Sequence, residues 1–156
     1  MLSFSHLIER IISTMKYKRY IFPVLMGVTM SVIMSLTNIG KIVFPSILIM
    51  MLMQAIVASI ASLIFPAGLA GVKIVKKFLP GITYIPTLLV SSLLPAVYFT
   101  LILSITGFLR MRGFSDDFFM IYLKSLPKNI ILGYATSILW NIVLDVALHK
   151  KGDSVK

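Results

Sequence analysis

Long uncharged runs of apolar residues restrict the fold of this chain more than any other feature of its sequence. Four runs lie between clusters of basic residues, at positions 20–40, 42–72, 78–109 and 129–144. The hydrocarbon core of a bilayer is about 30 Å thick, and about 20 apolar residues in a helix cross it. Backbone amides in lipid must be paired within their own segment, so each run is expected to form a helix. A membrane barrel would need strands of about 10 residues with alternating polarity, which these runs lack.

The composition excludes several classes of protein. Apolar residues make up 58% of the 156 residues and charged residues only 13%, against about 45–50% and about 25% in ordinary soluble domains. A chain of one domain's length cannot cover a water-exposed surface with so few charges. A soluble enzyme, a disordered tail and a nucleic-acid-binding protein are therefore excluded, and we expect no nucleic-acid partner. The sequence also has no cysteine, which excludes disulfides and thiolate metal sites.

The apolar runs predict four transmembrane helices. Pro45 is tolerated in the first turn of the second helix, and the breaker Leu79-Pro80-Gly81 precedes the third. The second and third helices are longer than a bilayer requires, so they are expected to tilt or to kink at Pro66 and Pro95. The predicted spans are residues 20–36, 46–72, 84–108 and 129–148.

The two halves of the chain look like copies of one another. YIFP at positions 20–23 opens the first half, YIP at 84–86 opens the second, and each half ends in paired lysines. We therefore predict an all-α integral membrane protein whose four transmembrane helices form two tandem helical hairpins, related by an axis along the membrane normal. The alternative is that any two hydrophobic hairpins look alike. The predicted divisions are an amphipathic segment at 1–19, hairpins at 20–78 and 79–151, and a basic tail at 152–156.

The basic residues predict the orientation of the chain. With four spans, the N-terminal segment, the middle loop near Lys73 and the C-terminal tail share one side and carry ten basic residues. The other side carries Lys41, Arg110 and Arg112, with Lys124 and Lys128 just beyond. The richer side is expected in the cytoplasm, so both termini are predicted to be cytoplasmic. The predicted partner of these charges is a lipid bilayer with anionic headgroups.

The N-terminal segment predicts an amphipathic surface helix that is retained in the protein. Over residues 1–17, apolar side chains recur at three- and four-residue spacing, as in Phe4, Leu7, Ile8 and Ile11. Charged and hydroxyl residues take the opposite face. This pattern is typical of a helix that lies in the membrane interface.

The first half of the chain carries a resemblance to a known family. MSLTNIG at positions 34–40 is followed by Phe44 and then by an Ala/Ser-rich helix that reaches Phe65-Pro66. This half resembles a hairpin of the domain-of-unknown-function family 2798, small bacterial membrane proteins. The family usually has an aromatic residue several positions into its second helix, where this chain has Met50-Met51 and, in the less similar second half, Tyr122. The resemblance implies the bacterial cytoplasmic (inner) membrane and carries no catalytic residues.

Three of the predicted spans carry stripes of small or polar residues at about four-residue spacing. Lipid provides no hydrophobic drive for helices to associate, so close packing of small residues and hydroxyl hydrogen bonds take that role. The stripes therefore predict a helix-packing seam, and the alternative is the lining of a polar pathway. The stripe residues are Gly27, Ser31, Ser35, Ala55, Ser59, Ser62, Ser92, Ala96, Thr100 and Ser104.

The fourth predicted span has a more polar stripe, with Tyr134, Ser137, Asn141 and Asp145 at three- and four-residue spacing. An ionisable group at the centre of a membrane costs about 2.5–3.5 kcal/mol on insertion scales. Asp145 is thus the candidate for coupling to a proton or a cation along a pathway. The alternative places it at the interface, paired with His149 or a lysine.

Lys124 and Lys128 lie one helical turn apart among aromatic residues and are a candidate contact for an anion or a lipid headgroup. The alternative is an interfacial helix whose lysines extend their charged ends toward water. Pro127 is expected to separate this segment from the fourth span.

No motif for catalysis or metal binding accompanies these features. The patterns HExxH and GxxxxGK(S/T), and GxSxG, do not occur. We therefore predict no enzyme activity, no cofactor and no metal. The expected function is that of an accessory or immunity-type protein acting through a membrane-protein partner or lipids. The alternative is a small homo-oligomeric transporter or channel for a small solute or ion.

Overall fold

The computed structural model describes residues 4–79 and 83–153, with no side chains described for residues 4–17, 39, 76, 84, 111, 112 and 148–153. The described ranges contain helices and no strand, which confirms the predicted all-α class. The elements are α1 (Phe4–Met34), the π-helical turn η1 (Ser35–Ile39), α2 (Ser46–Ile64), α3 (Ala67–Phe78), α4 (Tyr84–Arg112) and α5 (Phe118–Asp153).

Four of the helices are long and apolar enough to cross a membrane, as predicted. By the length and composition of these helices, the chain is a multi-pass membrane protein. Their apolar stretches are Lys18–Asn38, Ser46–Ile64, Ile85–Arg110 and Phe118–Ala147.

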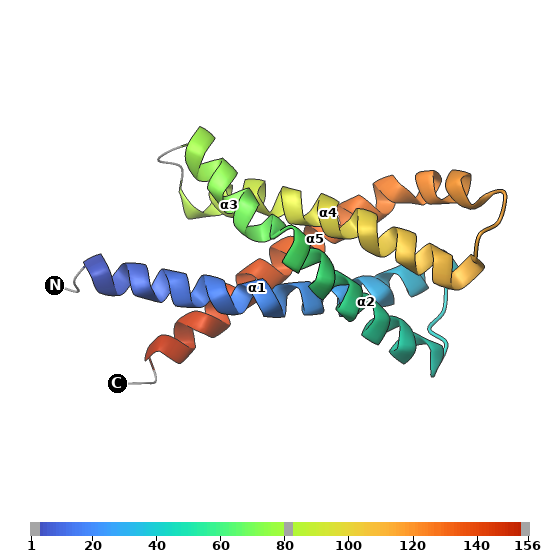
Figure 1. Ribbon diagram of the computed structural model, residues 1–156, viewed down its shortest axis with the longest axis horizontal. Coiled ribbons are helices and arrows are strands. Elements are labelled where there is room, and N and C mark those ends of the chain that lie inside the picture. The colour runs from blue at the N-terminus through green and yellow to red at the C-terminus, as the bar shows by residue number, and fades with distance from the viewer. Residues whose placement is uncertain (1–3, 80–82, 154–156) are drawn as a thin grey trace.

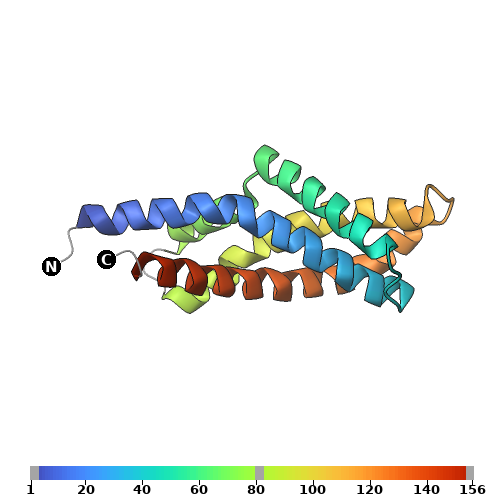
Figure 2. The same ribbon diagram turned by 90° about the horizontal axis from the view of Figure 1, so that it is seen from below.

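The helices form an elongated bundle with two distinct ends (Figure 1). α1 packs along α2, α4 packs along α5 and α3, and α5 also contacts α1. The start of α1, the end of α5, the end of α3 and the start of α4 lie at one end (Figure 1 and Figure 2). The α1–α2 and α4–α5 connections lie at the other end.

The second span is shorter than predicted, because the chain breaks before Pro66 and does not merely kink there. α2 ends at Ile64, and α3 begins at Ala67 as a separate helix. Pro66 has no N–H, and its ring disfavours helical conformation in the preceding residue. Phe65 is accordingly extended, with φ −135° and ψ 106°. The predicted continuation of this span to residue 72 is wrong.

The fourth span is longer than predicted, because Pro127 does not interrupt it. α5 continues through Pro127, so Lys124 and Lys128 belong to the same helix as Asp145. A break in the helix would leave several backbone N–H and C=O groups without partners, because lipid contains no water to pair them. Losing the one hydrogen bond that a proline cannot make disturbs the helix less. Pro23 and Pro95 also lie inside helices. The predicted separation at Pro127 is wrong.

The predicted N-terminal surface helix is the first part of α1, which continues into the first span without a break. The side chains that would form its apolar face, residues 4–17, lie outside the described side chains, so its amphipathic character stays a prediction. α1 gives way to η1, which is capped by Gly40 with φ 76°, a left-handed conformation that glycine adopts without penalty.

The outer surface of the bundle is apolar, and much of its interior is polar or small. On α2, Leu52, Ile56 and Ile60 recur every fourth residue and are exposed, whereas Gln54 and Ala58 are fully buried. Lipid on the outside accounts for the exposed ridge, and helix packing accounts for the small residues inside. This arrangement places the predicted stripes between helices.

Candidate functional site

The stripe of small residues in the third predicted span, which is α4, faces the polar stripe of α5. The Asn141 Nδ2 group donates to Ser92 Oγ at 3.0 Å, and Ser137 Oγ donates to the Ser92 carbonyl at 3.2 Å. Ser92 and Ser137 have no exposed surface. Ser137 and Asn141 therefore join α5 to α4.

The same contact continues along both helices toward the α4–α5 connection. A Cβ atom on Gly133 would overlap the Thr100 hydroxyl and would lie 3.7 Å from the Ala96 carbonyl oxygen. One turn further, Asn129 Nδ2 donates to Ser104 Oγ at 3.3 Å. We call this antiparallel contact the α4–α5 seam; it consists of Ser92, Ala96, Thr100 and Ser104 against Asn129, Gly133, Ser137 and Asn141.

Asn129 and Gly133 of this seam were not predicted, although the sequence carries a signal for them. Both continue the four-residue spacing of Ser137 and Asn141 toward the start of the helix. The expected break at Pro127 hid this signal, because it placed Asn129 at the very start of a span.

The first- and second-span stripes meet each other where the backbones approach closely. A Cβ atom on Gly27 would lie 2.5 Å from the Gln54 carbonyl oxygen and 2.8 Å from the Ala55 Cα. Closer to the helix ends, Ser62 Oγ donates to the Arg19 carbonyl at 3.2 Å, and Ser35 Oγ lies 3.8 Å from Met50 Sδ. We call this contact the α1–α2 seam.

Two stripe hydroxyls bond within their own helices. Ser31 Oγ donates to the Val28 carbonyl at 2.6 Å, and Ser59 Oγ donates to the Ala55 carbonyl at 2.7 Å. Such local bonds satisfy a hydroxyl in an apolar environment without a partner helix. Ser31 and Ser59 are therefore satisfied without a hydrogen bond to another helix.

Gln54 joins the two seams and was not among the predicted site residues. It is fully buried, and its Nε2 group donates to the Leu103 carbonyl of α4 at 3.1 Å and approaches Met34 Sδ at 3.9 Å. A glutamine inside an otherwise apolar run was the available signal, because polar groups in membrane helices usually have an internal partner.

Asp145 pairs with a residue far away in the sequence. Its carboxylate lies 2.5 Å from Lys18 Nζ, and about one fifth of each side chain is exposed, 22% and 21% respectively. Lys18 opens the first apolar stretch, so the ion pair lies at the end of the bundle that holds the start of α1. This position favours the interfacial interpretation, with a lysine of α1 as the partner.

The remaining residue of the α5 stripe bonds a different helix from Asp145. The Tyr134 hydroxyl donates to the Leu89 carbonyl of α4 at 3.0 Å. Tyr134 therefore fastens α5 to α4, whereas Asp145 bonds α1. The structure does not bring the four predicted pathway residues onto one common open face.

Lys124 and Lys128 are both exposed, and they do not share a partner in the described contacts. Lys128 Nζ donates to the Thr37 carbonyl at the end of the first span, at 3.3 Å. Their role as an anion or headgroup contact stays a prediction. The contact does show that Lys128 lies level with the turn that follows α1.

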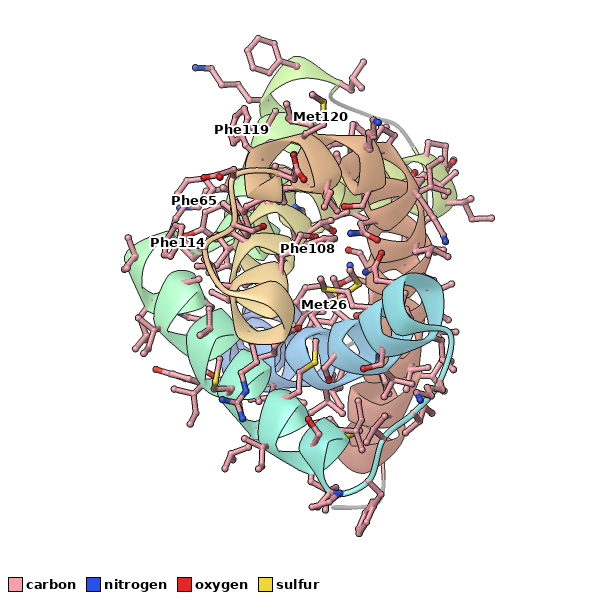
Figure 3. All side chains as sticks on the ribbon, turned by 90° about the vertical axis from the view of Figure 1, so that its right-hand side faces the viewer. Met26, Phe65, Phe108, Phe114, Phe119 and Met120 are labelled. Atoms are coloured by element: carbon pink, nitrogen blue, oxygen red, sulfur yellow. The ribbon has the colours of Figure 1, made fainter. Side chains whose placement is uncertain are left out.

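α4 and α5 extend past that level and expose apolar side chains there. Phe118 precedes Lys128 by ten residues, which is about 15 Å of helix. The relative exposure of Phe114 is 88%, of Phe119 66% and of Met120 61%. We call these three residues with Leu123 the α4–α5 tip. Figure 3 shows Phe114, Phe119 and Met120 on the outside of this end, while Phe108 and Met26 lie inside.

Of the three residues that the family resemblance singles out, Met50 and Tyr122 lie in one buried cluster beneath the tip, and Met51 does not. Met50 and Tyr122 pack together with Met34 and Phe108. The rings of Tyr122 and Phe108 meet edge to face, with centroids 6.2 Å apart. These positions therefore join α2 to the α4–α5 pair in this chain.

Three fully buried residues in the interior of the bundle each have an oxygen atom without a hydrogen-bond partner among the described residues. The atoms are Gln54 Oε1, Thr100 Oγ1 and Asn129 Oδ1, and all three residues have no exposed surface. The described residues contain no group of three or more His, Cys, Asp or Glu side chains that would hold a metal ion.

Comparison with family models, curated proteins and solved structures finds no match to this chain.

Proposed function

We propose that this chain is a non-enzymatic, multi-pass protein of the bacterial inner membrane that acts by binding a protein partner, as an accessory or immunity-type protein does. The observation that carries the proposal is the α4–α5 tip, an exposed apolar surface that extends past the α1–α2 connection at its end of the bundle (Figure 1). The family resemblance, the duplicated hairpin and the cytoplasmic location of both termini belong to the same proposal.

The lengths of the helices support a partner at the tip. The apolar stretches of α4 and α5 have 26 and 30 residues, against 21 and 19 for those of α1 and α2. At 1.5 Å per residue these are about 39 and 45 Å against about 32 and 29 Å. A hydrocarbon core of about 30 Å covers the α1–α2 pair but not the whole α4–α5 pair. Exposed apolar surface of this kind usually marks an interaction site.

The close packing of the interior supports the accessory role over transport by a single chain. Most stripe residues are used in contacts between helices, and at Gly27 the backbones of α1 and α2 are too close for even one more methyl group. A solute path needs polar groups that face water, whereas the polar groups of the two seams face each other. Transport would therefore require an assembly of several chains.

A photoreactive amino acid in place of Phe119 or Met120, introduced into cells, tests the proposal. We expect one discrete protein adduct at both positions. The matched control is Leu52, which lies on the lipid-facing ridge of α2 and should give no such adduct. Adducts with lipid alone at the tip, or the same products at Leu52, would contradict a protein partner.

A homo-oligomeric transporter or channel is the second candidate, and the three unpartnered oxygen atoms favour it. Flux of ions or small solutes into liposomes containing the purified protein tests this candidate. Flux that is lost in Asp145→Asn would replace the accessory proposal. No flux, with active control proteins in the same liposomes, would remove the transporter.

A further inference from the structure

α3 begins where α1, α2 and α5 reach one edge of the hydrocarbon core. α2 has 19 residues, which is about 29 Å of helix and enough to cross the core without α3. At this end of α2 the Ser62 hydroxyl bonds the Arg19 carbonyl, and the neighbouring Lys18 pairs with Asp145. α3 begins three residues after Ile64 and runs toward the end of the bundle that holds the start of α1 (Figure 1). It therefore lies at the boundary between lipid and water.

One side of α3 is fixed to α4. Ala67, Gly71 and Val75 recur every fourth residue on this side, and all three are buried. A Cβ atom on Gly71 would overlap the Ser91 carbonyl oxygen of α4. Such close backbone contact prevents α3 from rotating about its axis without losing its packing. The side chains that α3 exposes are therefore determined by this contact.

The outward side of α3 carries two short ridges of side chains. Lys73 and Lys77 form one ridge, and both are exposed. Ile74 and Phe78 form the other, with relative exposures of 47% and 72%. Residues four apart lie on the same side of a helix, and successive residues lie about 100° apart around its axis. The ridges therefore lie side by side, and Lys77 Nζ lies 5.8 Å from the centre of the Phe78 ring.

The lysine ridge has no acidic residue on its own helix or on the helix that supports it. No aspartate or glutamate lies between Glu9 and Asp116, so α2, α3 and α4 contain none. A cationic ridge beside an apolar ridge is typical of a helix that lies in the interface of an anionic membrane. A purely acidic partner would satisfy the lysines but leave Ile74 and Phe78 in water. An anionic phospholipid satisfies both ridges.

We propose that the outward side of α3 binds anionic phospholipid, with the phosphate at Lys73 and Lys77 and the acyl chains against Ile74 and Phe78. The predicted contact of the chain with anionic headgroups is thereby assigned to one surface. Because α3 is fixed to α4, binding of headgroups to α3 would set the depth of the whole bundle in the bilayer. The α4–α5 tip lies at the other end (Figure 1 and Figure 2), so this inference goes beyond the proposed function and either can fail alone.

Quenching of a label on α3 by brominated lipids tests the proposal. The chain has no cysteine, so Ile74→Cys provides a single attachment point for a fluorophore, and Phe78→Cys provides a second position. The labelled full chain is placed in vesicles of equal parts phosphatidylcholine and phosphatidylglycerol, with only one of the two lipids brominated. We expect brominated phosphatidylglycerol to quench more strongly, by about twofold or more, since one lysine near an anionic surface favours it by about fivefold. The excess should decrease at high salt.

A label on the lipid-facing ridge of α2 is the matched control. Leu52→Cys is exposed on that ridge and has no lysine beside it. The two brominated lipids should quench it equally. Equal quenching at positions 74 and 78 as well would overturn the selection of anionic lipid. No quenching there by either lipid would place the surface in water or against a protein, and would overturn the proposal altogether.

Charge variants test the two lysines. Lys73→Gln combined with Lys77→Gln should abolish the excess of quenching by phosphatidylglycerol, whereas Lys73→Arg combined with Lys77→Arg should keep it, because the charge is retained. Lys41→Gln removes one charge from an exposed position at the other end of the bundle, and should leave the excess unchanged. An excess that survives the two glutamine substitutions, or that disappears in Lys41→Gln, would overturn the assignment to α3.

Discussion

The α1–α2 seam and the α4–α5 seam are built from similar stripes of small residues, yet they hold their helices together in different ways. At Gly27 the α1–α2 seam brings two backbones together, with no room for a Cβ. The α4–α5 seam is joined by side chains, in the bonds of Asn141 and Ser137 to Ser92 and of Asn129 to Ser104. The same spacing in a membrane helix therefore serves either close approach or hydrogen bonding, and the partner helix decides which.

The largest expected effect is on the α1–α2 seam, in the substitution Gly27→Ala. Its Cβ would lie 2.5 Å from a backbone oxygen that cannot move independently. We expect a loss of about 2–3 kcal/mol in the free energy of unfolding, measured in detergent, because overpacking forces the helices apart. The matched control is Gly68→Ala, since a Cβ there meets nothing within 4 Å. Equal effects of the two substitutions would contradict close approach at Gly27.

A smaller effect is expected from the equivalent change in the α4–α5 seam, Gly133→Ala. The atom in the way is the hydroxyl of Thr100, the end of a side chain that can rotate. We expect a loss of about 1 kcal/mol, at the low end of overpacking effects. A Gly133→Ala,Thr100→Ala double variant, which removes the hydroxyl in the way, should recover part of this loss. A loss as large as that of Gly27→Ala would mean that both seams depend on backbone approach.

The hydrogen bonds of the α4–α5 seam are expected to contribute less individually. Asn141→Leu removes the bond to Ser92 and should lower the free energy of unfolding by about 0.6 kcal/mol, the average for such bonds between membrane helices. A double-mutant cycle with Ser92→Ala measures the coupling itself. Coupling near zero would remove hydrogen bonding as the distinction between the seams.

The smallest effect is expected at the ion pair that joins α5 to α1. Asp145→Asn removes the charge opposite Lys18, in a place where both side chains are partly exposed. We expect a loss of a few tenths of a kcal/mol, at most about 1 kcal/mol, which decreases at high salt. A larger, salt-independent loss would place Asp145 deeper than the interface.

The spans were predictable because apolar length is a local property, whereas the effect of each proline was not. The uncharged run around Met26 and the turn at Gly40 are visible in the sequence alone. Pro95 and Pro127 stay inside helices, but the chain breaks before Pro66. The separate helix α3 then packs on α4, with the backbones in contact at Gly71. That packing depends on a helix distant in the sequence.

The candidate site was likewise predictable only in the features that depend on local spacing. The burial of Ser92 and Ser104 follows from their four-residue spacing. The partner of Asp145 does not, because Lys18 reaches it only through the contact of α1 with α5. Gln54 likewise gains its importance from α4, which begins only at Tyr84.

Trp140 is the single tryptophan of the chain, and its Nε1 group donates to Thr29 Oγ1 across the α1–α5 contact at 2.9 Å. The bundle therefore contains an intrinsic fluorophore at the boundary between its two helix pairs. Separation of the pairs, by a ligand, a binding protein or a change of detergent, would change the emission of this one indole. Their association can thus be followed optically in the unlabelled protein.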